Sequence, residues 1–291
     1  METTELIKKV RKIEIKTRGL ANQIFSGEYH SVFKGRGMAF SEVREYQIGD
    51  DIRSIDWNVT ARFNHPYVKI FEEERELTVM ILVDVSGSGE FGTAVQMKKD
   101  LAIELCAVLA FSAIQNNDKV GIIFFSDIIE KFIPPKKGRT HILRIIRELL
   151  DFQPQHKKTN ITEALRYLRS AIKKRSIAFV ISDFMDKGFE DALKIANKKH
   201  DVVAINIYDQ REQELPAVGL MRLADAETGN VIWVDTAKKQ VRDNYKKWRQ
   251  QTEENLKSIF RKSGVDSINI RTDQSYVQPL MNFFRIREKR W

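Results

Sequence analysis

The spacing of hydrophobic and polar positions changes near Leu77. From Leu77 onward, short runs of β-branched and aromatic residues alternate with longer segments whose apolar residues recur at helical spacing. This alternation is typical of β-α-β units and predicts a doubly wound, mostly parallel sheet. The predicted strands are residues 77–84, 120–125, 128–133, 177–183, 202–208 and 267–270. The predicted helices are residues 97–115, 140–152, 161–174, 189–199, 241–263 and 276–284.

Two places depart from a purely parallel pattern. Only Ser126 and Asp127 separate the strands 120–125 and 128–133, and a parallel crossover needs about a dozen residues. One strand is therefore expected to run antiparallel to its neighbour. Further along, the turn sequence at residues 227–230 is flanked by short apolar runs, which predicts a hairpin insertion near residues 215–235. We expect residues 77–291 to form one α/β domain that carries this hairpin.

Residues 1–76 have a different pattern. They begin with a charged, helix-like stretch and continue into a segment rich in glycine, aromatic and charged residues without a long helical period. We expect an N-terminal helix and a small β-rich lobe. The lobe's alternating charges favour an ion-pair network that holds it on the main domain, with a partner surface or a second catalytic cluster as alternatives. These residues are Arg44, Asp50, Asp51, Arg53, Asp56 and Arg62.

Composition narrows the class of protein. No apolar run approaches the ~20 residues that cross a bilayer, and no early segment has the pattern of a secretory signal. The single cysteine, Cys106, lies in an apolar stretch, which favours a buried thiol and a reducing compartment. These features predict a cytoplasmic protein with at most peripheral membrane contact.

The formal net charge of +9 suits acidic proteins, anionic lipid surfaces or nucleic acid. Single-stranded nucleic acid is bound by basic clusters interleaved with exposed aromatic residues. Here the aromatic residues lie mostly inside apolar periodic stretches. The sequence therefore carries no strong signal for nucleic-acid binding, which stays an alternative.

Polar side chains gather where three predicted elements meet. Asp84, Ser86 and Ser88 follow a buried strand, Thr159 precedes a helix, and Asp183 ends another strand. In an open α/β sheet, ligands bind outside the carboxyl ends of the strands where the strand order reverses. Two carboxylates and three hydroxyls would converge there, and hard cations such as Mg²⁺ prefer oxygen ligands. Loops of this composition also serve simply as turns and helix caps.

These residues resemble a known motif. Asp84-x-Ser86-x-Ser88, Thr159 and Asp183 are similar to the metal-ion-dependent adhesion site of von Willebrand factor A domains. The N-terminal lobe resembles the bacterial DUF58 family more specifically. The matching stretches are Gly35-Arg36-Gly37-Met38-Ala39-Phe40, Arg44-Glu45-Tyr46, Gly49-Asp50-Asp51-Ile52-Arg53, Ile55-Asp56-Trp57 and Ala61-Arg62.

The resemblance implies a von Willebrand A-like domain that binds a divalent cation, Mg²⁺ first and Mn²⁺ or Ca²⁺ as alternatives. It implies that Ser86 and Ser88 hold the cation directly, Thr159 directly or through water, and Asp84 and Asp183 largely through water. It also implies a protein partner that presents Asp or Glu, namely a MoxR-type AAA+ ATPase or other von Willebrand A proteins in complex assembly or stress response. No catalytic activity is expected.

One departure concerns the residues before Thr159. Related domains often carry glycines there, whereas this chain has Lys157 and Lys158. Two nearby cations would weaken the affinity for a metal, or would favour an acidic partner side chain.

A Mg²⁺-dependent phosphoesterase-like enzyme is the main alternative, because aspartates at strand ends also serve phosphoryl transfer. The haloacid dehalogenase pattern needs a second aspartate where this chain has Ser86, and Ser86 lacks the Gly-x-Ser-x-Gly elbow of an acyl-transfer nucleophile. The histidines show no metal-ligand spacing. They are His30, His65, His141, His156 and His200.

Overall fold

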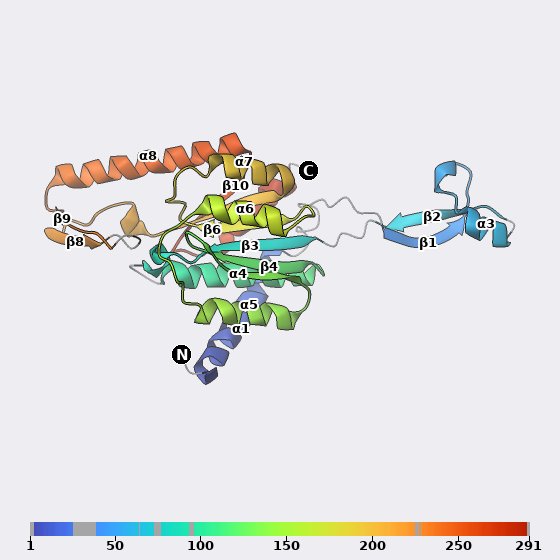
Figure 1. Cartoon of the computed structure of the whole chain (residues 1–291), viewed down its shortest axis with the longest axis horizontal. Helices are drawn as coiled ribbons and strands as arrows, with labels where there is room; N and C mark the ends of the chain where they lie inside the picture. The colour runs from blue at the N-terminus through green and yellow to red at the C-terminus, as the bar shows by residue number, and fades with distance from the viewer. Residues whose placement is uncertain are drawn as a thin grey trace. The chain divides into compact units, whose positions relative to one another are not determined.

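The computed structural model describes residues 3–25, 39–63, 65–72, 77–92, 96–224, 227 and 229–289. The chain divides into two units, one formed by Met1–Val32 with Leu77–Trp291 and the other by Phe33–Glu76. The larger unit contains the candidate site, and many of its helices and strands are labelled in Figure 1.

A central sheet organises the larger unit. Within the described residues it has six strands in the order β10-β7-β6-β3-β4-β5. All neighbours are parallel except β4 and β5, which confirms the predicted mostly parallel sheet with one antiparallel strand. The strands are β3 (Thr78–Asp84), β4 (Lys119–Phe125), β5 (Ile129–Lys136), β6 (Ile177–Ser182), β7 (Asp201–Tyr208) and β10 (Asp266–Arg271).

Helices cover both faces of this sheet (Figure 1). On one face α1 (Thr3–Phe25), α4 (Lys98–Gln115), α5 (Arg139–Asp151) and α9 (Val277–Glu288) contact one another. On the other face α6 (Ile161–Ala171), α7 (Glu190–Lys199) and α8 (Lys239–Ser263) pack in sequence. The predicted helices are thus found, although α6 ends earlier than expected because Ile172 is extended and buried.

Burial explains why the strands form where they do. In β3 the run from Val79 to Val83 is buried on both faces, with exposures of 2% or less. Continuous apolar runs of this kind are typical of parallel strands that are covered by helices. Helix α4 is likewise buried on nearly every side, and only helices inside a layered fold have that pattern.

Gly121 in β4 lies where no side chain fits. A Cβ at this position would be 2.8 Å from Met80 Sδ and 2.9 Å from the backbone nitrogen of Pro135. We expect Gly121→Ala to lower the free energy of unfolding by about 1–3 kcal/mol, because overpacking forces the neighbouring strands apart. Urea unfolding measures this change. Gly19→Ala is the control, since open space surrounds Gly19 on α1 and alanine there should stabilise by about 0.5–1 kcal/mol.

The predicted insertion is present as an antiparallel hairpin of β8 (Leu220–Ala224) and β9 (Val231–Asp235). It is followed by α8, which ends at Gly264 with a left-handed φ of 65°, as the sequence predicts for a glycine cap. None of the helices in the described part of the chain has the length and apolar composition needed to cross a membrane.

The smaller unit pairs β1 (Ala39–Glu45) with β2 (Tyr67–Glu72) in antiparallel fashion. Between them lie the short helices η1 (Ile52–Ser54) and α3 (Trp57–Phe63). The charged residues of the lobe are paired locally: Arg44 donates to both carboxylate oxygens of Asp50, at 2.8 and 2.7 Å. The guanidinium of Arg44 is the main cause that lowers the pKa of Asp50. This pair lies within the lobe, so the ion-pair network that holds the lobe on the main domain stays a prediction.

Helix α1 differs from the predicted division of the chain. The sequence grouped it with the lobe in residues 1–76, whereas α1 contacts α4, α5 and α9 of the larger unit. Its apolar residues recur at helical spacing at Val10, Ile13, Leu20 and Ile24, but such a stripe does not say which part of the chain it packs against. The packing is completed by ion pairs, in which Arg139 donates to Glu14 at 2.6 Å and Lys16 donates to Glu104 at 2.7 Å.

Candidate functional site

The site lies at the carboxyl edge of the sheet, where the chain order reverses at β3. From β3 the chain continues to β4 and β5 on one side, whereas β6 and β7 lie on the other side. The connection after β3 leads to α4 on one face and the connection after β6 leads to α7 on the opposite face. Diverging connections leave a crevice at such a point. Asp84 and Ser182 end the two strands that border it.

Asp84 is fixed by hydrogen bonds from both loops. Its Oδ1 accepts a hydrogen bond from the Ser86 N–H at 3.0 Å, and its Oδ2 accepts one from the Ser182 hydroxyl at 2.6 Å. The hydroxyls of Ser86 and Ser88 lie 3.2 Å apart. The short helix η2 (Gly87–Glu90) starts directly after Ser86 and turns the loop back over the strand end. Three predicted site residues, Asp84, Ser86 and Ser88, are therefore together.

Thr159 lies in the loop before α6, and this loop is hydrogen-bonded to the loop that follows β3. The Gly87 N–H donates to the Lys157 carbonyl at 2.9 Å, which joins the two loops through their backbones. Asn160 then caps α6, because its side chain accepts from the Glu163 N–H at 3.0 Å. The Thr159 hydroxyl donates at 2.7 Å to Oε1 of Glu227, which lies in the turn between β8 and β9.

Asp183 pairs with a buried lysine. The Lys98 ammonium donates to Asp183 Oδ2 at 2.9 Å and also contacts Glu212. Lys98 is only 4% exposed. Burial lowers the pKa of this lysine, but the charges and hydrogen bonds of Asp183 and Glu212 outweigh that effect and raise it. Lys98 is therefore a charged ammonium inside the candidate site.

The backbone after Asp183 is unusual. Phe184 has a φ of 52°, in the left-handed region that bulky residues seldom adopt. Its N–H donates to the Ser182 hydroxyl at 3.1 Å, and its ring packs against Phe189 and Phe260. This packing holds the turn that directs the Asp183 carboxylate toward Lys98.

The two aspartates repel each other. Burial, followed by the charge of Asp183, raises the pKa of Asp84 to about 7, although the hydrogen bonds from Ser182 and Ser86 oppose the rise. A carboxyl with such a pKa is typical of functional sites. Keeping Asp84 ionised in the folded protein therefore costs free energy, and a positive charge close to its carboxylate would lower that cost.

The donor atoms fit a small divalent cation. A cavity of about 20 Å³ is lined by Asp84, Ser88, Lys98 and Asp183, and a volume of this order holds one water or small ion. Within the described residues no cluster of three or more His, Cys, Asp and Glu side chains could hold a metal alone. Hydroxyl groups would thus have to complete the shell, as hard cations with oxygen ligands allow.

The structure adds three residues that the sequence interpretation missed: Lys98, Glu212 and Glu227. One signal was available for Lys98. A cation in the first turn of a helix faces the positive end of the helix dipole, so a lysine at the start of α4 is favoured by a carboxylate nearby, although the same signal applies to Lys99, which donates to a backbone carbonyl. No comparable signal exists for Glu227, because turn residues have no periodic pattern.

The other candidates have structural surroundings. His141 lies 2.9 Å from the Val120 carbonyl, and His200 lies 2.9 Å from the Ser176 hydroxyl. Cys106 is buried, which raises the pKa of its thiol. His30 and the stretch 35–38 lie outside the described residues.

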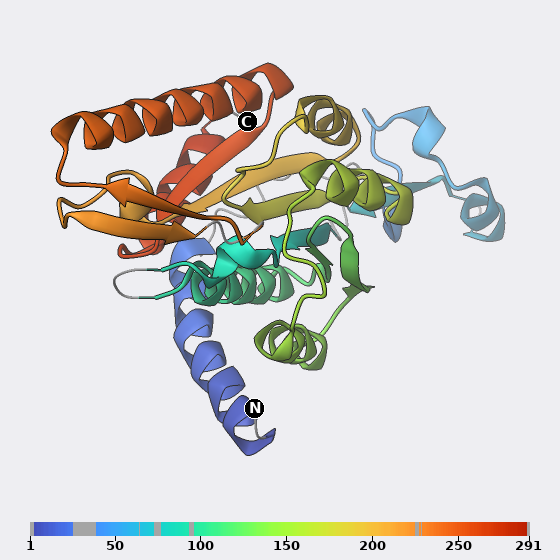
Figure 2. The same cartoon turned by 60° about the vertical axis from the view of Figure 1, so that its left-hand side comes forward.

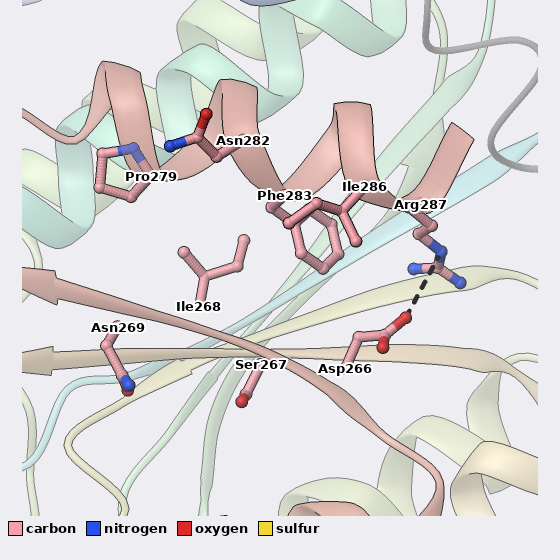
Figure 3. A pocket seen from close by; sticks show the side chains of 9 residues that line it. All are labelled: Asp266, Ser267, Ile268, Asn269, Pro279, Asn282, Phe283, Ile286 and Arg287. Carbon is pink, nitrogen blue, oxygen red and sulfur yellow. Dashed lines mark ion pairs between the residues drawn. The ribbon is translucent and has the colours of Figure 1, made fainter. Parts of the chain in front are cut away.

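A second pocket lies between the edge strand β10 and helix α9 (Figure 3). It has a volume of about 300 Å³. Arg287 lies at one end, 3.7 Å from Asp266, and also pairs with Asp201. Because Arg287 on α9 is paired with aspartates of two strands, we interpret the pocket as the junction that fastens α9 to the sheet.

The topology and the position of the site define a von Willebrand A-like domain with an inserted hairpin. An aerotolerance-related membrane protein from Bacteroides fragilis shares the fold, with a TM-score of 0.51 and 17% identity over 74% of this chain and 100% of that chain. The family described as "Protein of unknown function DUF58" matches residues 42–255, so the chain belongs to this family.

Two further similarities were found. The uncharacterized protein Rv1480 of Mycobacterium tuberculosis is 29% identical over 294 residues, which cover 99% of this chain and 92% of that protein. The protein BatB from Bacteroides thetaiotaomicron aligns with 73% of this chain and 99% of its own, at 19% identity and a TM-score of 0.49.

Proposed function

We propose that the carboxyl-edge site binds a divalent cation, Mg²⁺ first, and through it a carboxylate of a protein partner. The chain would then be a metal-dependent interaction module. One observation carries this proposal: Asp84, Ser86, Ser88 and Asp183 gather at the ends of β3 and β6, and the neighbouring Thr159 hydroxyl already donates to a carboxylate. The same place thus has ligands for a hard cation and a position for an acidic group.

Each residue has a distinct part in this proposal. Ser86, Ser88 and Thr159 supply neutral hydroxyl oxygens, and Asp84 and Asp183 supply negative charge that Lys98 only partly neutralises. A bound cation supplies the remaining positive charge and an open ligand position. Because the hydroxyls are neutral, a carboxylate from outside completes the charge balance rather than overloading it.

For the partner, we propose a MoxR-type AAA+ ATPase or another von Willebrand A protein, as the family resemblance implies, with both partners in the cytoplasm. The net charge of +9 favours an acidic partner surface. We assign no catalytic step to this chain.

The direct test is cation binding by the full-length protein. Isothermal titration with MgCl₂ and MnCl₂ should show one site in the wild type. We expect Asp84→Ala to lose detectable binding, because it removes a carboxylate from the centre of the site. Asp191→Asn is the matched control, since this exposed aspartate lies in the first turn of α7 and should leave binding unchanged. Equal affinity of Asp84→Ala and wild type would refute the proposed site.

Partner binding is tested by affinity purification from the native cell. Wild type and Asp84→Ala are each used with Mg²⁺ and with EDTA, and captured proteins are identified by mass spectrometry. An AAA+ ATPase should appear only with metal-loaded wild type. If the same ATPase is captured in all four samples, the interaction uses a surface other than this site.

A further inference from the structure

A carboxylate of this chain accepts a hydrogen bond from one of the hydroxyls of the candidate site. Glu227 Oε1 accepts the hydrogen bond of the Thr159 hydroxyl at 2.7 Å, although the two residues are far apart in sequence. The strands β8 and β9 carry Glu227 in the turn between them. Figure 2 shows this hairpin beneath α8, with its turn directed at the loop that follows β3.

A groove continues from the site along the hairpin. It has a volume of about 920 Å³, and Ser88 and Asp183 line it together with Glu227. Its other walls include large apolar and aromatic side chains from the hairpin, α8 and the loop after β7. These are Leu215, Pro216, Met221, Ile232, Tyr245 and Trp248. The carboxylate position is thus continuous with an apolar surface.

Two hydrogen bonds close the hairpin at its base. Thr236 bonds back to the Gly219 carbonyl through its N–H at 2.8 Å and its hydroxyl at 2.7 Å. Beyond this anchor, Leu220, Ile232 and Trp233 are 67%, 59% and 65% exposed. An isolated two-stranded hairpin is only marginally stable in water, so contacts such as that of Glu227 with Thr159 decide where its turn lies. Ile232 lines the groove, whereas Leu220 and Trp233 lie on the opposite face of the hairpin, because neighbouring residues of a strand alternate between its faces.

We propose that Glu227 is an internal carboxylate ligand that closes the hairpin over the cation site, and that a partner binds by displacing it. The occupant that replaces it is a protein segment with an Asp or Glu beside large apolar side chains. The carboxylate takes the place of Glu227 at Thr159, and the apolar side chains enter the groove next to Met221 and Trp248. This inference rests on the proposed function, since it specifies the ligand of the same site.

Charge supports this choice of occupant. Arg211 and Arg222 line the same groove, so its outer part attracts an acidic segment. At the inner end Lys98 pairs with both Asp183 and Glu212, and the cation of the proposed function would supply the positive charge that this one ammonium does not. A basic or purely apolar segment would leave the Thr159 hydroxyl without its carboxylate.

Hydrogen–deuterium exchange of the full-length protein tests the internal ligand. Peptides covering residues 218–236 are followed with MgCl₂ and with EDTA. In the wild type we expect Mg²⁺ to slow exchange of the hairpin by on the order of tenfold, because the turn becomes held at the site. Glu227→Gln should abolish this response and weaken Mn²⁺ binding by on the order of tenfold. Glu214→Gln is the control, since Glu214 pairs with Lys246 at the surface.

The outcomes separate the two proposals. If Mg²⁺ binds to the wild type but hairpin exchange does not change, the internal ligand is refuted and the cation site stands. If exchange responds equally in Glu227→Gln, another group closes the hairpin and the proposal is wrong. If neither Mg²⁺ nor Mn²⁺ binds to any variant, the proposed function itself fails.

A labelled peptide with the sequence of residues 220–235 tests the partner chemistry, because it combines a glutamate with apolar side chains. In fluorescence anisotropy with Mg²⁺, it should bind Glu227→Gln protein on the order of tenfold more tightly than wild type, since the intramolecular competitor is removed. The same peptide without side-chain carboxylates, carrying Asp225→Asn, Glu227→Gln and Asp235→Asn, should not bind. Equal binding of both peptides would overturn the requirement for a carboxylate.

Discussion

Metal-free Asp84→Asn is expected to be more stable than metal-free wild type at pH 8, by on the order of 2 kcal/mol. Burial and the charge of Asp183 raise the pKa of Asp84 to about 7 in the folded protein. At pH 8 the wild type must therefore keep an ionised carboxylate in unfavourable surroundings. Asparagine removes that charge, and its amide can still accept from the Ser86 N–H. At functional sites, replacing a residue that serves function commonly increases the stability of the fold.

The pH dependence gives this prediction its sign. The carboxyl of Asp84 has an ordinary pKa of 3.8 and a folded-state pKa of about 7. Between these values the folded state binds a proton that the unfolded state lacks, so the contribution of Asp84 to stability falls as the pH rises. Its cost is complete above about pH 7. The advantage of Asp84→Asn should therefore shrink as the pH falls toward 4.

Urea unfolding at pH 4.5, 6 and 8 in EDTA measures this difference. Asp191→Asn serves as control, because this exposed carboxylate should give no comparable gain at any of the three values. Adding Mg²⁺ at pH 8 should stabilise the wild type and leave Asp84→Asn unchanged, which would reverse or reduce the difference between them. A wild type that is more stable than Asp84→Asn in EDTA at pH 8 would contradict the electrostatic account.

The central sheet was predictable because its strands are nearly pure apolar runs. Residues 79–83 have no interpretation other than burial on both faces, and the short connection at Ser126 and Asp127 fixed the antiparallel pair. The location of the residues that end these strands follows from the sheet, since parallel strands align their carboxyl ends at one edge. Asp84, Ser86 and Asp183 could therefore be assigned to one edge before their contacts were known.

The groups that complete the site could not be predicted in the same way. Lys98 lies at the start of a helix and Glu227 lies in a hairpin turn. At such positions the hydrophobic periodicity of the sequence does not determine the direction of a side chain. Helix α1 was misassigned for a related reason, because neither its apolar stripe nor the charge of Glu14 names the distant segment, with Arg139, that it contacts. Polar contacts between distant segments leave little trace in a single sequence.

Lys98→Met should destabilise the metal-free protein by about 3 kcal/mol, since it removes the cation shared by two carboxylates. The side chains of Lys98 and Asp183 are 5% and 6% exposed, so Asp183 would stay buried without a counter-charge. Methionine keeps most of the length of the lysine side chain, and the loss therefore reports charge rather than volume. Mg²⁺ supplies positive charge at the same place, so the stabilisation by Mg²⁺ should be larger in Lys98→Met than in the wild type.

Lys99→Met is the matched control for this change. Lys99 is the next residue of α4 and also lines the small cavity, but its ammonium donates to the Phe152 carbonyl at 3.1 Å and is not paired with Asp183 or Glu212. We expect it to cost less than about 1 kcal/mol and to leave the response to Mg²⁺ unchanged. Thermal unfolding of both variants with EDTA and with a series of Mg²⁺ concentrations measures the two effects together. If Mg²⁺ stabilises both variants equally, the Lys98 ammonium does not balance the charge of the site, and the prediction is wrong.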